Sequence, residues 1–253
     1  MTDFEQLAQI EGLTPAAVGE HLYGLAARVP ADQAVVELGV YKGRTACYLA
    51  AGARSGHGAR VWAFDPWDLP GLRVPYTASV KRRRHRVQFT SKQTRLQAKR
   101  NVHRAGLRDW VTLVRGFSVE EGERWAGPPV GLLYVDGDHR YGAVVADFEA
   151  WRPHLVDGAV VVFDDYAKSH REVIEAVDAM VAAGDLELVE VICDRLAVTR
   201  LPGATEPEPG PEVEVEVERP KASEPKAAWE TWARAAGYDT EGLTKADLMK
   251  LGR

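Results

Sequence analysis

Cysteine is scarce in this chain of 253 residues, which contains only Cys47 and Cys193. Two cysteines cannot build a disulfide framework, so we interpret both as small buried hydrophobic residues and expect a reducing, cytoplasmic setting. No stretch approaches the roughly 20 apolar residues of a membrane span, and the first residues lack the basic-then-apolar pattern of a secretory signal. We therefore expect no membrane partner.

A strong positive charge is also missing, because the formal net charge is -5. This balance argues against nucleic acid as the main partner of the chain. With 45% hydrophobic and 27% charged residues, the composition is that of a globular protein with a substantial core.

Acidic residues are absent between Asp68 and Asp109, whereas basic residues are frequent there. The basic side chains include Lys81, Arg82, Arg83, Arg84, Arg86, Lys92, Arg95, Lys99, Arg100 and Arg104. This basic insertion, at about residues 69–108, has two interpretations: a solvated helix face, or a cover over a site that attracts an anionic substrate or partner. Charge alone does not decide between them.

Short β-branched runs alternate with helix-length segments from residue 34 onward. The predicted strands are Ala34–Leu38, Val61–Asp65, Val111–Val114, Leu132–Asp136, Ala159–Phe163, Leu186–Cys193 and Leu196–Thr199. This alternation predicts an α/β domain, residues 1–201, with a Rossmann-like, mostly parallel seven-stranded sheet and helices on both faces. Only Asp194 and Arg195 join the last two strands, so one strand must be antiparallel. Residues 15–29 have helical spacing after Thr14 and Pro15.

The C-terminal part has a different composition. Residues 202–226 are rich in Pro and Glu, which predicts an extended acidic linker. Residues 227–253 predict a small helical module, in which Thr244 and Asp247 resemble a capped helix start. Such a module is too small for independent stability, so we expect it to dock, for example as an oligomer contact.

Aspartates end two of the predicted strands, one on either side of a helix-length segment. Asp136 ends the first of these strands, and Asp164 and Asp165 follow the second. Neighbouring parallel strands would bring the three carboxylates into one crevice at the carboxyl edge of the sheet. Either one carboxyl group keeps its proton or a cation shares them, and a hard divalent ion is the simplest cation. Mg²⁺, or Mn²⁺, suits oxygen ligands better than Zn²⁺ does, unless His139 joins them.

A glycine-containing turn follows the first predicted strand, with Glu37, Gly39 and Gly43 ahead of a helix. Glycines there allow a tight turn and a close approach of the backbone to a ligand. Tyr41 stands where a dinucleotide fingerprint has its middle glycine, which disfavours a nicotinamide-dependent oxidoreductase. Asp65, at the end of the second strand, is placed to accept the hydroxyls of a ribose.

The order of these features over residues 14–200 resembles the class I S-adenosylmethionine-dependent methyltransferases. The longer pattern Asp136-Gly-Asp138-His139-x-Tyr141, with Asp147, Trp151, Leu155, Gly158 and Asp164-Asp165-Tyr166, is similar to metal-dependent O-methyltransferases. That subgroup includes enzymes that modify sugar hydroxyls of macrolide and aminocoumarin antibiotics, and a protein described as a cephalosporin hydroxylase. The resemblance implies cofactor contacts from Glu37, Gly39, Gly43, Asp65, Gly116, Ser118 and Asp136.

The resemblance implies methyl transfer to a hydroxyl of a small molecule or sugar, with Asp136, Asp164 and Asp165 on the metal. Asp138 or His139 would accept the proton of the hydroxyl. Other roles remain open, since Asp138 could cap the following helix and His139 could be a surface residue. A different class is also open: a non-catalytic binding protein whose basic insertion and helical module hold a partner.

Overall fold

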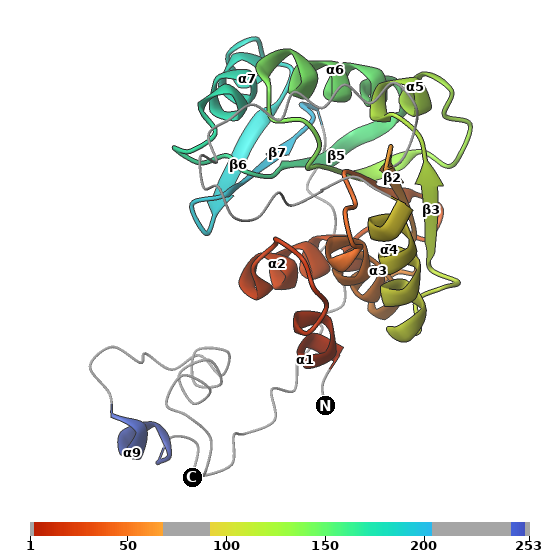
Figure 1. The fold of residues 1–253 in the computed structure, drawn as a ribbon. Helices are drawn as coiled ribbons and strands as arrows, with labels where there is room; N and C mark the ends of the chain where they lie inside the picture. The colour runs from red at the N-terminus through yellow and green to blue at the C-terminus, as the bar shows by residue number, and fades with distance from the viewer. Residues whose placement is uncertain (1–2, 68–91, 204–243, 251–253) are drawn as a thin grey trace, which may run out of the picture. The chain divides into compact units, whose positions relative to one another are not determined.

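The computed structural model describes residues 3–67, 92–203 and 244–250 (Figure 1). Its contacts divide the chain into two units, residues 1–211 and 212–253, and each is described by itself. Almost all of the predicted linker, most of the predicted helical module and the first part of the basic insertion lie outside the described residues.

A seven-stranded sheet forms the centre of the first unit, with the strand order β3-β2-β1-β4-β5-β7-β6. The strands are β1 (Ala34–Leu38), β2 (Arg60–Asp65), β3 (Val111–Arg115), β4 (Val130–Val135), β5 (Leu155–Phe163), β6 (Glu187–Ile192) and β7 (Leu196–Arg200). Strands β1 to β5 pair in parallel, whereas β7 is antiparallel to both of its neighbours. The predicted α/β sheet with one reversed strand is therefore confirmed, and the reversed strand lies between β5 and β6.

Helices cover both faces of this sheet, with α1 to α4 on one side and α5 to α7 on the other (Figure 1). The first layer contains α1 (Asp3–Ala8), α2 (Ala16–Ala27), α3 (Arg44–Ser55) and α4 (Lys92–Arg104). The second contains α5 (Ser118–Glu123), α6 (Tyr141–Trp151) and α7 (Arg171–Ala182), and the 3-10 turn η1 (Arg152–His154) joins α6 to β5. The predicted helix over residues 15–29 corresponds to α2.

The central strands are buried on both faces, which explains why their residues are apolar apart from Glu37. Because side chains alternate along a strand, β4 sends Leu132 and Tyr134 into the core beneath α2 and α3. Leu133 and Val135 enter the other core, beneath α6 and α7. A polar residue that continues the first series, such as Asp136, consequently belongs to the α2–α3 side of the sheet.

Helix α4 is the described part of the basic insertion. Thr94, Ala98 and Val102 are buried along one face of this helix. The exposed face carries Lys92, Lys99, Arg100 and Arg104. The helix is therefore amphipathic, with a packed apolar side and a solvated basic side.

The two cysteines differ in their surroundings. Cys47 is buried in α3, as predicted, whereas Cys193 is exposed, so its predicted burial is wrong. The cause is the earlier end of β6 at Ile192, which places Cys193 in the following turn with a positive φ of 53°.

No helix among residues 3–67, 92–203 and 244–250 is long and apolar enough to cross a membrane. In the second unit, the described residues form the short helix α9 (Lys245–Leu248). Thr244 accepts a hydrogen bond from the backbone of Asp247, and the Asp247 side chain accepts one in return from the backbone of Thr244. The predicted capped helix start at this position is therefore present.

Candidate active site

Acidic side chains form a row across the carboxyl edge of four neighbouring strands. The register aligns Asp65 of β2 with Gly39 after β1, Gly39 with Asp136 after β4, and Asp136 with Asp164 after β5. Backbone hydrogen bonds continue past the strand ends, from Gly39 N to Phe64 O at 2.9 Å and from Asp136 N to Leu38 O at 2.8 Å. The predicted convergence of acids at one edge of the sheet is therefore present in the structure.

Gly39 leaves a gap in this row between Asp65 and Asp136. Its φ is +92°, and a Cβ atom at this position would lie 2.0 Å from the backbone oxygen of Asp136. A side chain of any kind is therefore excluded. The backbone of the loop after β4 fills the space beside Gly39 instead.

Glu37 lies on β1, two residues before Gly39. Its side chain is buried, and neither carboxylate oxygen has a hydrogen-bond partner among the described residues. Burial, followed by the neighbouring carboxylates of Asp136 and Asp65, raises the pKa of Glu37 well above its ordinary value. A buried carboxylate without a partner is costly, so this position favours either a proton or a cationic ligand.

Asp65 holds the glycine turn together. Its Oδ2 accepts hydrogen bonds from the backbone of Val40 at 3.0 Å and of Tyr41 at 2.9 Å, and its Oδ1 accepts one from Trp67 at 2.7 Å. Tyr41 and Trp67 both have positive φ angles, so the carboxylate stabilises a strained backbone. A carboxylate has about four acceptor positions, which leaves roughly one of them for a ligand such as a ribose hydroxyl.

The other residues predicted to contact a cofactor occupy different surroundings. Gly43 has a φ of +78° and packs against α4, because a Cβ atom there would lie 3.3 Å from Ala98 Cα. Gly116 follows β3, and its N–H donates to Asp65 O at 3.2 Å, so it lies at the same edge of the sheet. The structure thus places Gly116 near the row of acids, whereas Gly43 lies at the contact between the glycine turn and α4.

Ser118 begins α5 and is held from two sides. Its hydroxyl forms a short hydrogen bond with the buried carboxylate of Asp147, and its backbone oxygen accepts a hydrogen bond from Trp151 Nε1 at 2.9 Å. Burial raises the pKa of Asp147 to about 6, although the Ser118 hydrogen bond opposes the rise. The segment after β3 is therefore fixed by two residues of α6, Asp147 and Trp151.

The raised pKa of Asp147 predicts a pH-dependent stability. Between the unfolded pKa of about 4 and the folded value, the native state keeps a proton that the unfolded chain has lost, so stability falls as the pH rises. The variant Asp147→Asn lacks this loss, and its stability relative to the native chain should increase by about 2 kcal/mol from pH 4 to pH 7. Urea unfolding at both pH values measures the difference, and a constant difference would contradict this assignment.

Arg195, from the turn before β7, neutralises the acids after β5. Its Nε lies 2.7 Å from Asp164 Oδ1, and its Nη2 lies 2.6 Å from Asp164 Oδ2 and 3.1 Å from Asp165 Oδ1. The Asp164 side chain is fully buried, whereas that of Arg195 is 25% exposed. Both oxygens of Asp164 are therefore committed to an arginine.

Asp136 lies beside this ion pair. Burial, followed by the charges of Asp164 and Asp165, raises the pKa of Asp136 well above its ordinary value, and Arg195 opposes this effect. The Tyr134 hydroxyl lies 3.4 Å from Asp136 Oδ2, and His139 Nε2 lies 3.6 Å from Asp136 Oδ1. Asp136 thus lies between Glu37, which is predicted to contact a cofactor, and His139.

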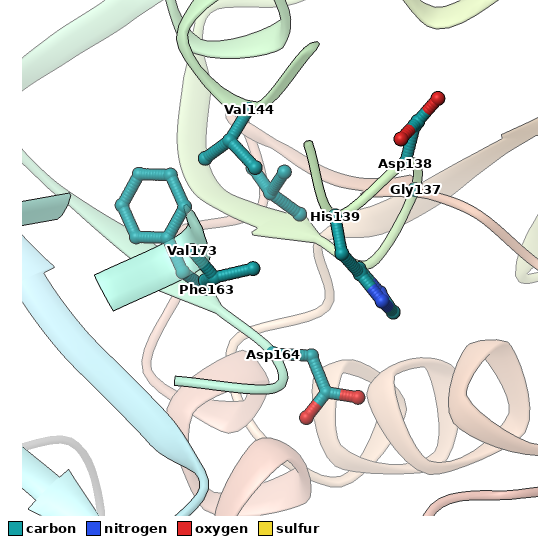
Figure 2. A pocket seen from close by; sticks show the side chains of 8 residues that line it. Gly137, Asp138, His139, Val144, Phe163, Asp164 and Val173 are labelled. Carbon is teal, nitrogen blue, oxygen red and sulfur yellow. The ribbon is translucent and has the colours of Figure 1, made fainter. Parts of the chain in front are cut away.

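The two predicted proton acceptors point in different directions (Figure 2). Asp138 is paired with Arg140, and its carboxylate points away from Asp164, whereas His139 lies between them. Burial opposes the ionisation of Asp138, but the hydrogen bonds from Arg140 outweigh it and lower the pKa of Asp138. Arg140 is the N-cap of α6, and its own side chain makes no capping hydrogen bond. Asp138 Oδ1 accepts a hydrogen bond from Arg140 N at 3.1 Å, whereas the first N–H of the helix, that of Tyr141, donates to Glu172 Oε2 at 2.9 Å.

Apolar side chains border the same region. Val144, Phe163 and Val173 line one side of the hollow in Figure 2, opposite His139 and Asp164. These apolar walls exclude water from one side of the charged groups, which strengthens their interactions.

Two charged residues at this edge were not assigned to the site from the sequence. Arg195 stands out in the sequence only as part of a two-residue turn, and no motif singles out His170. His170 Nε2 in fact lies 3.5 Å from Asp165 Oδ2. The spacing Asp165-x-x-x-x-His170 was the available signal, but the direction of each side chain depends on the turn at Asp165, where φ is 54°.

A family of methyltransferase domains matches residues 36–166, which is just over half of the chain. The chain belongs to this methyltransferase family. A stretch of 56 residues is 38% identical to an uncharacterized protein of Acanthamoeba polyphaga mimivirus and covers 21% of this chain and 25% of that protein. The chain thus spans about a quarter of the length of that relative.

Solved structures show the same fold. The O-methyltransferase TomG from Streptomyces achromogenes, involved in tomaymycin synthesis and solved with S-adenosylmethionine, is 15% identical with a TM-score of 0.58. The match covers 80% of this chain and 91% of TomG. The O-methyltransferase NovP is 22% identical with a TM-score of 0.56, and the match covers 74% of this chain and 80% of NovP. The class I methyltransferase fold expected from the sequence is therefore confirmed.

Proposed function

We propose that this protein is an S-adenosylmethionine-dependent O-methyltransferase that uses a divalent metal ion and acts on a hydroxyl of a small molecule or sugar. The observation that carries this proposal is the buried Glu37, which has no hydrogen-bond partner among the described residues. It lies on β1, two residues before Gly39. Its surroundings suit a cationic ligand, and S-adenosylmethionine carries both an ammonium and a sulfonium group. The structural similarity to TomG and NovP, both O-methyltransferases, supports the same reaction.

The residues around Glu37 fit this cofactor. Glu37 would accept hydrogen bonds from the ammonium group, and the remaining acceptor position of Asp65 would serve a ribose hydroxyl. Gly116 and Ser118 would border the adenine, with Ser118 contributing its backbone because its hydroxyl is bonded to Asp147. When bound, the cofactor supplies an activated methyl group for an in-line displacement by the acceptor oxygen.

The chain itself must orient the acceptor and remove its proton. His139 is better suited to this task than Asp138, because Asp138 is committed to Arg140. The Nε2 atom of His139 is buried and has no hydrogen-bond partner in the described structure, and Asp136 lies 3.6 Å from it. A carboxylate beside an imidazole stabilises the imidazolium that forms when the ring accepts a proton.

The acids after β4 and β5 also support a divalent ion. Its chemistry would be to bind the acceptor oxygen, lower its pKa and fix its direction. Asp136, Asp164 and Asp165 are the ligands predicted from the sequence, with Mg²⁺ or Mn²⁺ as the ion. Arg195 already donates one hydrogen bond to each oxygen of Asp164, so in this ligand set the ion would share that carboxylate with the arginine.

The basic face of α4 supports an acceptor with negative charge. Asn101 of α4 donates to Lys42 O in the glycine turn at 2.8 Å, so this helix borders the cofactor side of the site. Its exposed Lys92, Lys99, Arg100 and Arg104 would attract an anion toward that side.

Calorimetric titration with S-adenosylmethionine tests the role of Glu37. We expect the native chain to bind the cofactor, and Glu37→Gln to bind it about 10-fold to 100-fold more weakly because a charge-assisted hydrogen bond is lost. Glu175→Gln, on the exposed side of α7, is the matched control with unchanged affinity. Equal affinities of all three proteins would contradict the assignment, and absence of binding by the native chain would favour a non-catalytic binding protein.

A methyl-transfer assay completes this test. Purified protein is incubated with the cofactor and with sugars, phenols and catechols, and the methyl ether is detected by mass spectrometry. Addition of a chelator should abolish the product, and re-addition of a divalent ion should restore it. Full activity with the chelator would remove the metal from the proposal but leave the methyl transfer.

A further inference from the structure

Three ligand-type side chains meet next to the acids of β5, and they are not the three predicted from the sequence. His139, Asp165 and His170 each direct one nitrogen or oxygen atom into a common space, and these atoms lie within 4.8 Å of one another. His139 comes from the loop after β4, whereas Asp165 and His170 come from the loop between β5 and α7. The three side chains are partly buried, with exposed fractions of 26%, 13% and 30%.

The two separations from Asp165 are close to those of ligands around one ion. His139 Nδ1 lies 3.4 Å from Asp165 Oδ2, and His170 Nε2 lies 3.5 Å from the same oxygen. Both distances are long for hydrogen bonds between these groups. Ligands held at about 2.1 Å from a metal, at angles of roughly 90–110°, are separated by roughly 3.0–3.4 Å.

Each histidine has a polar group near the ring nitrogen that would not bind the metal, within hydrogen-bond distance at His170 and beyond it at His139. A metal on His170 Nε2 requires the proton on Nδ1, which lies 3.1 Å from Ser169 Oγ, an atom able to accept it. A metal on His139 Nδ1 requires the proton on Nε2, which faces Asp136 Oδ1 at 3.6 Å. Such outer partners fix the tautomer and orientation of metal-bound histidines.

Arg195 binds the two neighbouring aspartates to different extents. It holds both oxygens of Asp164 and the Oδ1 of Asp165, which leaves Asp165 Oδ2 toward the histidines. The left-handed backbone at Asp165, with a φ of 54°, turns its side chain away from that of Asp164. The ion pair with Arg195 and the group with the two histidines can therefore exist together without any movement.

We propose that His139, Asp165 and His170 bind the divalent ion through two imidazoles and one carboxylate, and that the site therefore prefers a first-row transition metal to Mg²⁺. This inference rests on the proposed function, because it specifies the ion that would orient the acceptor. Imidazole nitrogens favour ions such as Zn²⁺ and Co²⁺, whereas Mg²⁺ prefers oxygen ligands. Three protein ligands leave further coordination positions for acceptor oxygens. His139 then serves as a metal ligand in place of the proton acceptor named above, and Asp136 acts through it as a positioning residue.

Metal binding is measured on the metal-free, untagged full chain, without cofactor or acceptor. Co²⁺ is followed by its visible absorption, and Zn²⁺ and Mg²⁺ are titrated calorimetrically. We expect Zn²⁺ and Co²⁺ to bind at least about 100-fold more tightly than Mg²⁺. The variants His170→Ala and Asp165→Asn should each weaken Co²⁺ binding by about 100-fold, and Asp136→Asn, which removes an outer partner, by about 10-fold.

Two controls make the result specific. His103→Ala removes an exposed histidine of α4 and should leave Co²⁺ binding unchanged. Circular dichroism and S-adenosylmethionine binding by His170→Ala report whether the variant is folded, and they test the proposed function separately from the metal ligands. Tighter binding of Mg²⁺ than of Zn²⁺, or binding that survives His170→Ala but is lost in Asp164→Asn, would overturn the proposal in favour of the carboxylate set. Absence of any metal binding by the native chain would overturn it as well.

Discussion

Replacement of Arg195 by methionine should destabilise the protein by about 3 kcal/mol, because removal of one partner of a buried ion pair leaves an uncompensated charge. Asp164 is the residue left without its partner, since its side chain is fully buried and both of its oxygens are bound to Arg195. We place the expected loss at the lower end of the usual range because the arginine is 25% exposed and therefore partly screened. Urea unfolding at neutral pH measures the change.

Two further variants distinguish the loss of this ion pair from a general loss of packing. In the Arg195→Met background, Asp164→Asn removes the buried charge and should recover at least half of the lost stability. Arg140→Met breaks the exposed pair with Asp138 and should leave the stability almost unchanged. If Asp164→Asn destabilises the Arg195→Met protein further, the proposed reason for the loss is incorrect.

Gly39→Ala should cost roughly 3 kcal/mol or more and prevent cofactor binding, because two unfavourable effects coincide at one position. The backbone has a φ of +92°, and the new Cβ atom would lie 2.0 Å from the backbone oxygen of Asp136. To relieve this contact, the loop after β4 would have to move away from β1. The surroundings of Glu37 would change with it. Thermal unfolding and cofactor titration measure the two effects.

A second glycine provides the matched control. Gly24 lies within α2, and a Cβ atom there meets no other atom within 4 Å. Gly24→Ala should therefore leave cofactor binding unchanged and stabilise the protein by up to about 1 kcal/mol, because alanine has the higher helix propensity. A normal cofactor affinity in Gly39→Ala would show that the close approach of Gly39 to Asp136 does not matter for the site.

The fold could be predicted largely because its strands are distinct in the sequence. The first strand, Ala34–Leu38, was predicted with its observed bounds, since a strand buried on both faces is a continuous apolar run. Only two residues separate the last two predicted strands, which required a reversed strand. The sequence contains no comparable signal for the position of β7 between β5 and β6, because that order depends on pairing between distant segments.

The candidate site could be predicted in part, for a related reason. Strand ends determine which residues reach the carboxyl edge, so Asp65, Asp136 and Asp164 could be brought together from the sequence alone. The partners of these acids depend on loop conformation, which local patterns do not specify. Arg195 and His170 were missed because each reaches the site from a turn whose direction is set by tertiary contacts.

The reversed direction of β7 brings the beginning of that strand, rather than its end, to the edge of the sheet where the acids lie. The guanidinium of Arg195, which pairs with Asp164, therefore comes from the turn before β7. This turn is one of the last parts of the sheet to be synthesised. A nascent chain that has not yet emerged beyond β5 would carry these carboxylates without their counter-charge. Completion of the β6–β7 hairpin is therefore the step of folding at which Asp164 acquires its counter-charge.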